Sequence, residues 1–222
     1  PLPSAALPQA QAVHIPAGPA QLEGLLALPP APRGVVLFAH GSGSSRHSPR
    51  NTQVARVLQA HGLGTLLPDL LTPAEDLQRE NRFDIALLAR RLLAAVQWLQ
   101  QHSGTRGLPL GLFGASTGAA AALTAAATLG SAVGAVVSRG GRPDLTEPAA
   151  LARVRCPTLL LVGGHDEAVL ELNRQAARQM RAPVSLCVVP GASHLFEAAG
   201  TLDVVAQAAA DWFVQHLPPA AG

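Results

Sequence analysis

The chain has 222 residues, of which 48% are hydrophobic and 14% charged, a composition that indicates a compact globular domain and excludes a disordered chain. The formal net charge is +2 and the 16 basic residues, all arginines, are spread along the chain, so we expect no nucleic-acid partner. No apolar run approaches the roughly 18–20 residues that cross a bilayer, and residues 1–8 lack the pattern of a secretion signal. We therefore expect a cytoplasmic protein with no membrane partner, whose two cysteines form no disulfide framework.

Short apolar runs alternate with amphipathic stretches along the chain. The runs are bounded by Gly, Pro or Asp and predict strands that are covered on both faces, at Val35–Ala39, Gly64–Pro68, Leu108–Phe113, Val133–Val137, Thr158–Val162 and Val184–Val189. Leu22–Leu28 has a weaker pattern and predicts an edge strand before them. Apolar residues at helical spacing predict helices over Asn51–His61, Phe83–Gln101, Thr117–Leu129, Ala168–Met180 and Leu202–Leu217.

This alternation predicts a single α/β domain over residues 1–222, with parallel βαβ units in a doubly wound sheet. Residues 1–12 and 218–222 are rich in Pro and Ala, and we expect frayed ends there. In such a sheet the reactive residues lie in the loops at the carboxyl ends of the strands. Those loops are therefore the place to look for chemistry.

The pentapeptide Gly114-Ala115-Ser116-Thr117-Gly118 lies between a predicted strand and a predicted helix, the context of a nucleophile elbow. Asp166 and His194 follow two later strands, and the order Ser, Asp, His along the chain is that of the α/β-hydrolase fold. We expect Ser116 to be the nucleophile, His194 the general base and Asp166 the acid that orients the imidazole. Asp69, which follows Gly64–Pro68, is the alternative acid.

The segment His40-Gly41-Ser42-Gly43 follows the first strongly apolar run. The backbone N–H groups of Ser42 and Thr117 are the expected donors of an oxyanion hole, since two aimed donors are needed where charge develops. His40 ends a strand beneath the elbow and is favoured as a structural hydrogen-bonding residue over a base. The histidines do not recur at the spacing of metal ligands, so no metal is expected.

With these residues placed, the chain resembles the α/β-hydrolase superfamily, and within it the dienelactone hydrolase-like family, from about Leu22 to Leu217. The segments that carry the resemblance are FAHGSGSSRHSPRN (38–51), LLPDLLTPAE (66–75), GLFGASTGAAAAL (111–123), SRGGRPDL (138–145), LLLVGGHDEAV (159–169) and VPGASHLFE (189–197). The resemblance implies a three-layer fold whose mostly parallel sheet has eight strands or slightly fewer. It also implies helices on both faces and hydrolysis without a cofactor. The segment between Val137 and Thr158 has no long insertion, which predicts little or no lid.

The resemblance supports Ser116, Asp166 and His194 as the triad. The enzymes that give the family its name use a cysteine nucleophile, so a serine at position 116 favours general carboxylesterase chemistry over dienelactone specificity. The Gly- and Ser-rich segment with its R-H-S-P-R-N continuation is similar to a subgroup of small hydrolases, some of which occur fused to phosphoribosyltransferase domains.

Arg139 and Arg142 follow a predicted strand end and are candidates to bind a substrate carboxylate or phosphate; the alternative is a loop ion pair with Asp144 or Glu147. Arg46 and Arg50 are candidates for the same role, with the same alternative of a loop ion pair. Further candidates for the wall of the pocket include Phe83 and Leu195, although Phe83 could equally be the first core contact of its helix.

Together these features predict a serine hydrolase that cleaves small to medium carboxylic esters or lactones through an acyl-enzyme. Its partner would be a small-molecule ester, and its oligomeric state a monomer or homodimer. Acyltransferases, thioesterases and peptidases use the same triad, so the sequence leaves them open. A catalytically inactive binding module is the alternative from a different class.

Overall fold

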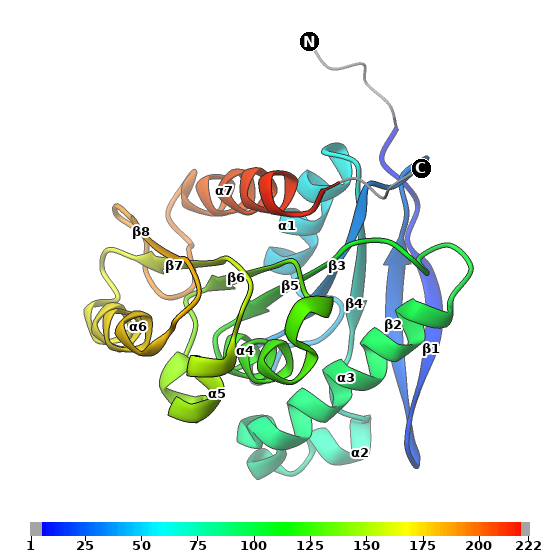
Figure 1. Ribbon diagram of the computed structural model, residues 1–222, viewed down its shortest axis with the longest axis horizontal. Helices are drawn as coiled ribbons and strands as arrows, with labels where there is room; N and C mark the ends of the chain where they lie inside the picture. The colour runs from blue at the N-terminus through cyan, green and yellow to red at the C-terminus, as the bar shows by residue number, and fades with distance from the viewer. Residues whose placement is uncertain (1–5, 219–222) are drawn as a thin grey trace.

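The computed structural model describes residues 6–218, which form one eight-stranded sheet flanked by helices (Figure 1). The strand order is β1-β2-β4-β3-β5-β6-β7-β8. The strands are β1 (Gln11–Ala17), β2 (Ala20–Ala27), β3 (Gly34–Ala39), β4 (Leu63–Pro68), β5 (Leu110–Ala115), β6 (Ala135–Arg139), β7 (Thr158–Gly163) and β8 (Val184–Val189). The pairs β1–β2 and β2–β4 are antiparallel, and all other pairs are parallel. This confirms the predicted mostly parallel α/β sheet.

Helices cover both faces of the sheet, as Figure 1 shows. The helices α1 (Pro49–Ala60) and α7 (Thr201–His216) pack together on one face. On the other face lie α3 (Ile85–Gln101), α4 (Thr117–Leu129), α5 (Pro148–Arg153) and α6 (Glu167–Gln179). The short helix α2 (Pro73–Asp76) and three 3-10 turns, η1 (Arg79–Phe83), η2 (Gly130–Ala132) and η3 (Pro143–Leu145), connect these elements. No helix in the described part of the chain has the length and apolar character to cross a membrane.

The central strands are buried along their whole length, which explains why their sequences are almost continuously apolar. Successive side chains of β3 enter opposite cores, with Val35 and Leu37 on the α3–α4 face and Val36 and Phe38 on the α1–α7 face. The rings of Phe38 and Phe113 lie 4.8 Å apart between their centroids. The sheet is therefore fixed from both sides, and its carboxyl edge is a rigid base for loops.

The structure differs from the sequence predictions at the amino-terminal edge. Gln11 and Ala12, expected in a frayed end, are the first residues of β1, and β2 is the second strand of the sheet. The outer face of β1 is exposed, so only part of its side chains are apolar, and the segment lacks the run that marks a central strand. The expected frayed residues 1–5 and 219–222 lie outside the described residues.

The segment between β6 and β7 contains only η3 and α5, both of which pack against α4. This segment therefore places no inserted lid over the carboxyl ends of the strands. Phe83 ends η1, before the N-cap of α3 at Asp84, and its side chain is 46% exposed. The reading of Phe83 as the first core contact of the helix is therefore wrong.

Candidate active site

Ser116 forms a strained turn between β5 and α4. Its backbone has φ 53° and ψ −120°, the left-handed side of the map that non-glycine residues rarely adopt. A Cβ on Gly114 would lie 2.4 Å from Ala119 Cα, and a Cβ on Gly118 would lie 2.1 Å from the carbonyl oxygen of Ala39. Only glycine fits at both positions, because the turn brings α4 directly against β3 and β5.

Backbone hydrogen bonds hold this turn against the loop after β6. The Ser116 N–H donates to the carbonyl oxygen of Arg139 at 3.2 Å, and the Arg142 N–H donates to the carbonyl oxygen of Ser116 at 3.1 Å. The Ala119 N–H donates to the same Ser116 oxygen at 3.1 Å. Strain of this kind persists where the surroundings over-determine the conformation, as these bonds do.

Asp166 and His194 are joined by a short hydrogen bond. The Nδ1 atom of His194 donates to Oδ2 of Asp166 at 2.6 Å, and the Asp166 side chain is only 15% exposed. The two loops can approach this closely because residue 163 is glycine. A Cβ there would lie 2.4 Å from the carbonyl oxygen of Ala192, which no other residue would permit. With Nδ1 engaged in this way, Nε2 is the ring nitrogen left to accept a proton.

Ser116 and His194 line one cavity of about 250 Å³, which also involves Ser42, Arg139 and Leu195. The imidazole lies over the loop after β6, where a Cβ on Gly140 would be 3.5 Å from two of its ring atoms. Within residues 6–218 no hydrogen bond joins the Ser116 hydroxyl to the imidazole. In enzymes without substrate this contact is often long and shortens in the complex.

The loop after β3 passes beside the nucleophile. A Cβ on Gly41 would lie 3.3 Å from Ser116 Cβ, and Gly43 has φ +73°, so both glycines allow the close turn. Ser42 lines the cavity at Ser116 and, together with Thr117, a second space of about 10 Å³ beside it. The two expected oxyanion residues are thus brought to the same side of the elbow.

His40 and Asp69 have other partners. His40 Nδ1 donates to the carbonyl oxygen of Gly41 at 2.9 Å, and its Nε2 accepts the Leu70 N–H at 3.0 Å. Burial lowers the pKa of His40, which keeps the ring neutral and suited to this structural role. Asp69 accepts the Arg46 N–H at 2.6 Å and pairs with the Arg46 guanidinium, which also contacts Glu23 at 2.6 Å. The geometry therefore favours Asp166 over Asp69 as the partner of His194.

The arginine candidates separate clearly. Arg142 forms a two-pronged ion pair with Asp144 at 2.8 and 2.7 Å, which raises the Arg142 pKa, and it is not among the residues lining the cavity at Ser116. Arg139 lines that cavity, is 8% exposed, and donates from Nη2 to Oδ1 of Asn51 at 3.2 Å. Arg50 lines the same cavity, and Leu195, 44% exposed, forms part of its rim. Phe83 is not among the lining residues.

Ser48 and Asn51 are functional-site candidates that the sequence did not predict. Ser48 caps α1 by accepting the Asn51 N–H at 3.2 Å, and it lines the cavity at Ser116. The signal for both was present as a serine followed by proline in the S-P-R-N segment, a typical helix start. No group of three His, Cys, Asp or Glu side chains suited to a metal ion occurs within residues 6–218.

The sheet order, the elbow and the paired Asp and His at adjacent strand ends define an α/β hydrolase. The sequence pattern described as "Dienelactone hydrolase family" matches residues 22–217, and the chain belongs to this family.

Solved structures agree with this assignment. The crystal structure of a dienelactone hydrolase from Anabaena variabilis is 53% identical to the chain, covers 95% of it and 99% of its own length, and superposes with a TM-score of 0.92. Est1E from Butyrivibrio proteoclasticus, which has also been solved with ferulic acid bound, is 16% identical and shares the fold with a TM-score of 0.79; the match covers 92% of this chain and 98% of that one.

Curated relatives carry a different name. Proteins of two Mycobacterium tuberculosis strains, each named "Putative phosphoribosyl transferase", are 57% identical over 205 residues, which is 92% of this chain and 46% of theirs. The chain thus spans about half the length of the curated relatives it matches.

Proposed function

We propose that the protein hydrolyses carboxylic esters or lactones of small to medium size through an acyl-enzyme on Ser116. The observation that carries this proposal is the 2.6 Å hydrogen bond between His194 and Asp166, with His194 and the elbow serine lining one cavity. The family supports a hydrolase, and the serine supports ester chemistry of the acyl-transfer type.

In the first half of the proposed reaction, Ser116 Oγ attacks the acyl carbon while Nε2 of His194 accepts the hydroxyl proton. The charged imidazole is stabilised by Asp166, which keeps its own negative charge. His194 then gives the proton to the departing alcohol oxygen, leaving the acyl group on Ser116. In the second half His194 deprotonates a water molecule, which attacks the acyl carbon. The bond from that carbon to Ser116 Oγ then breaks, the serine oxygen takes the proton back from His194, and the acid leaves.

Negative charge develops on the carbonyl oxygen in both halves. The N–H groups of Thr117 and Ser42 are the proposed donors, supported by their position at the same side of the elbow. Thr117 is the first residue of the 13-residue helix α4, whose N-terminus adds a favourable potential for an anion.

The same machinery can transfer an acyl group to another acceptor or cleave a thioester or peptide. The His194 side chain is 39% exposed, and the segment between β6 and β7 adds no lid, so water reaches the acyl carbon readily. This access of water favours hydrolysis over acyl transfer to another acceptor. The phosphoribosyl transferase name belongs to proteins about twice as long, and the residues of this site support acyl chemistry.

Labelling with a fluorophosphonate tests the proposal. We expect the intact mass of the protein to rise by one adduct, together with loss of p-nitrophenyl acetate hydrolysis, and we expect Ser116→Ala to abolish both labelling and hydrolysis. Ser131→Ala, in the distant turn η2, is the matched control and should label normally. An unlabelled wild-type protein without esterase activity would support a binding module instead.

A further inference from the structure

The cavity at Ser116 is positively charged. Two arginines, Arg50 and Arg139, line it, and none of its lining residues in the described part of the chain is acidic. Three serines of the loop before α1, Ser42, Ser44 and Ser48, form much of the remaining polar wall. Such a combination of guanidinium and hydroxyl groups is suited to an anion rich in oxygen atoms.

Arg139 has no acidic partner in the described part of the chain. Its side chain contacts the neutral Asn51 oxygen at 3.2 Å and lies over the ring of Phe196 at 6.0 Å, while its Nε atom is buried without a hydrogen-bond partner. No carboxylate oxygen of residues 6–218 comes within 4.0 Å of its guanidinium nitrogens. Burying a charge in this way is costly unless a counter-charge compensates it.

The pKa of Arg139 is that of a buried cation without an acidic partner in the described part of the chain. Burial, and secondarily the charge of Arg50, lowers the pKa of Arg139 to about 10. The group therefore stays cationic at neutral pH but is destabilised by its surroundings. The other arginines close to the site differ, since Arg46 is paired with Asp69 and Arg142 with Asp144.

Arg50 and the N-terminus of α1 add to the positive potential of this cavity. Arg50 Nε donates to the Leu195 carbonyl oxygen at 2.7 Å, which fixes the guanidinium at the cavity wall. Its nearest carboxylate, on Glu197, is 3.9 Å away and 68% exposed, so it compensates little. Ser48 caps the 12-residue helix α1, whose positive N-terminus therefore meets this cavity.

We infer that this cavity binds a phosphate group carried by the ester substrate, held between Arg139 and Arg50 beside the Ser116 hydroxyl. This inference rests on the proposed function in one respect, namely that the bound phosphate belongs to an ester that Ser116 cleaves. A phosphate monoester carries close to two negative charges at pH 7 and three acceptor oxygens, which match two guanidinium groups and a helix N-terminus. A carboxylate carries one charge and would leave one arginine uncompensated.

Three small probes with the same aromatic ring test the inference: phenyl phosphate, benzoate and benzyl alcohol. Each is measured as a competitive inhibitor of p-nitrophenyl acetate hydrolysis. We expect phenyl phosphate to have an inhibition constant at least about 10-fold below that of benzoate, with benzyl alcohol the weakest. Arg139→Gln and Arg50→Gln should each raise the phenyl phosphate constant by about 10-fold or more, because each removes a charge-assisted contact.

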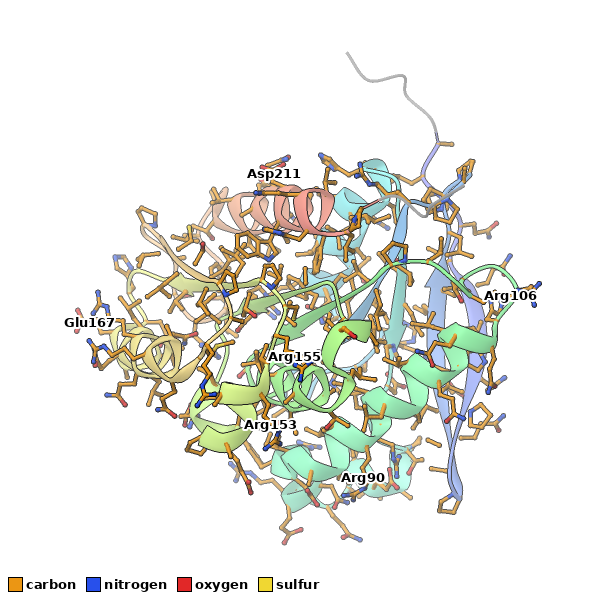
Figure 2. All side chains as sticks on the ribbon, in the orientation of Figure 1. Arg90, Arg106, Arg153, Arg155, Glu167 and Asp211 are labelled. Carbon is orange, nitrogen blue, oxygen red and sulfur yellow. The ribbon has the colours of Figure 1, made fainter. Side chains whose placement is uncertain are left out.

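Arg153→Gln is the control for a general effect of charge. Arg153, the last residue of α5, is exposed (Figure 2) and lines a different cavity, so its loss should leave the inhibition constant unchanged. Arg50 is one-third exposed, so Arg50→Gln remains informative if Arg139→Gln fails to fold. Equal affinity for phenyl phosphate and benzoate, or Arg50→Gln binding phenyl phosphate as wild type does, would overturn the phosphate site.

Calorimetry with phenyl phosphate on Ser116→Ala separates this inference from the proposed function. If wild-type protein hydrolyses no ester, the proposed function fails, while the calorimetric affinity still reports on the anion site. If esters are hydrolysed but the Ser116→Ala protein binds phenyl phosphate no better than benzyl alcohol, the phosphate site alone is refuted.

Discussion

The assignment of the acid predicts opposite outcomes for Asp166→Asn and Asp69→Asn. Asparagine at 166 can no longer accept the Nδ1–H bond as an anion, so the imidazole is held in the wrong tautomer and its charged form loses a partner at 2.6 Å. For triad acids this change lowers kcat by about 10⁴-fold, equivalent to roughly 5.5 kcal/mol in the activation barrier. The folded state should lose little, because the isosteric amide occupies the same volume.

Asp69→Asn should instead affect stability. Asp69 bonds both the backbone N–H and the guanidinium of Arg46, with side chains 19% and 23% exposed. Losing the charge of such a half-buried pair should cost about 1–2 kcal/mol. For a chain of this size that lowers the melting temperature by about 2–4 °C per kcal/mol.

Steady-state kinetics with p-nitrophenyl acetate and a thermal melt on the same samples check both outcomes. We expect Asp166→Asn to lose turnover with a nearly unchanged melt, and Asp69→Asn to melt earlier with kcat within about 3-fold of wild type. Loss of turnover in Asp69→Asn with activity retained in Asp166→Asn would refute the assignment of the acid.

Two further changes test the framework around the site. Gly118→Ala places a Cβ 2.1 Å from the Ala39 oxygen, so urea unfolding should show that the free energy of unfolding falls by at least about 3 kcal/mol. Gly164→Ala is the control, because a Cβ there would lie 3.4 Å from its nearest neighbour, and its free energy of unfolding should stay within about 1 kcal/mol of wild type. Similar urea midpoints for both variants would contradict the close approach at the elbow. Burial lowers the pKa of His40, so below about pH 6.5 the unfolded chain takes up a proton that the folded chain excludes. The free energy of unfolding should therefore decrease as the pH is lowered, by up to about 1.4 kcal/mol per pH unit. The melting temperature of His40→Gln should depend less on pH than that of wild type between about pH 7.5 and 5.5. Parallel curves for the two proteins would rule out this linkage.

Much of the fold was predictable because the central strands are buried on both faces and therefore read as continuous apolar runs between Gly and Pro. The prediction failed at β1, whose outer face is exposed and whose alternation within Gln11–Ala17 is too weak to separate from a loop. The meeting of Asp166 and His194 followed from the rule for parallel sheets, since both residues come after adjacent strands, β7 and β8.

The arginines show where the sequence stops being informative. Arg142 and its partner Asp144 are two residues apart, and the pairing was foreseen as one of two alternatives. Arg139 contacts Asn51, 88 residues away, and its lack of an acidic neighbour in the described chain depends on where the first turn of α1 lies relative to the end of β6. Such long-range surroundings are set by tertiary packing, which local pattern does not encode.

The bonds between Ser116 and the loop after β6 use backbone atoms alone. Arg139 contributes to these bonds through its carbonyl oxygen and not through its side chain. If Arg139 holds the ligand as we infer, its side chain can be exchanged without removing the backbone bonds that hold the Ser116 turn. Position 139 is then a natural place for related proteins, or for an engineer, to alter selectivity.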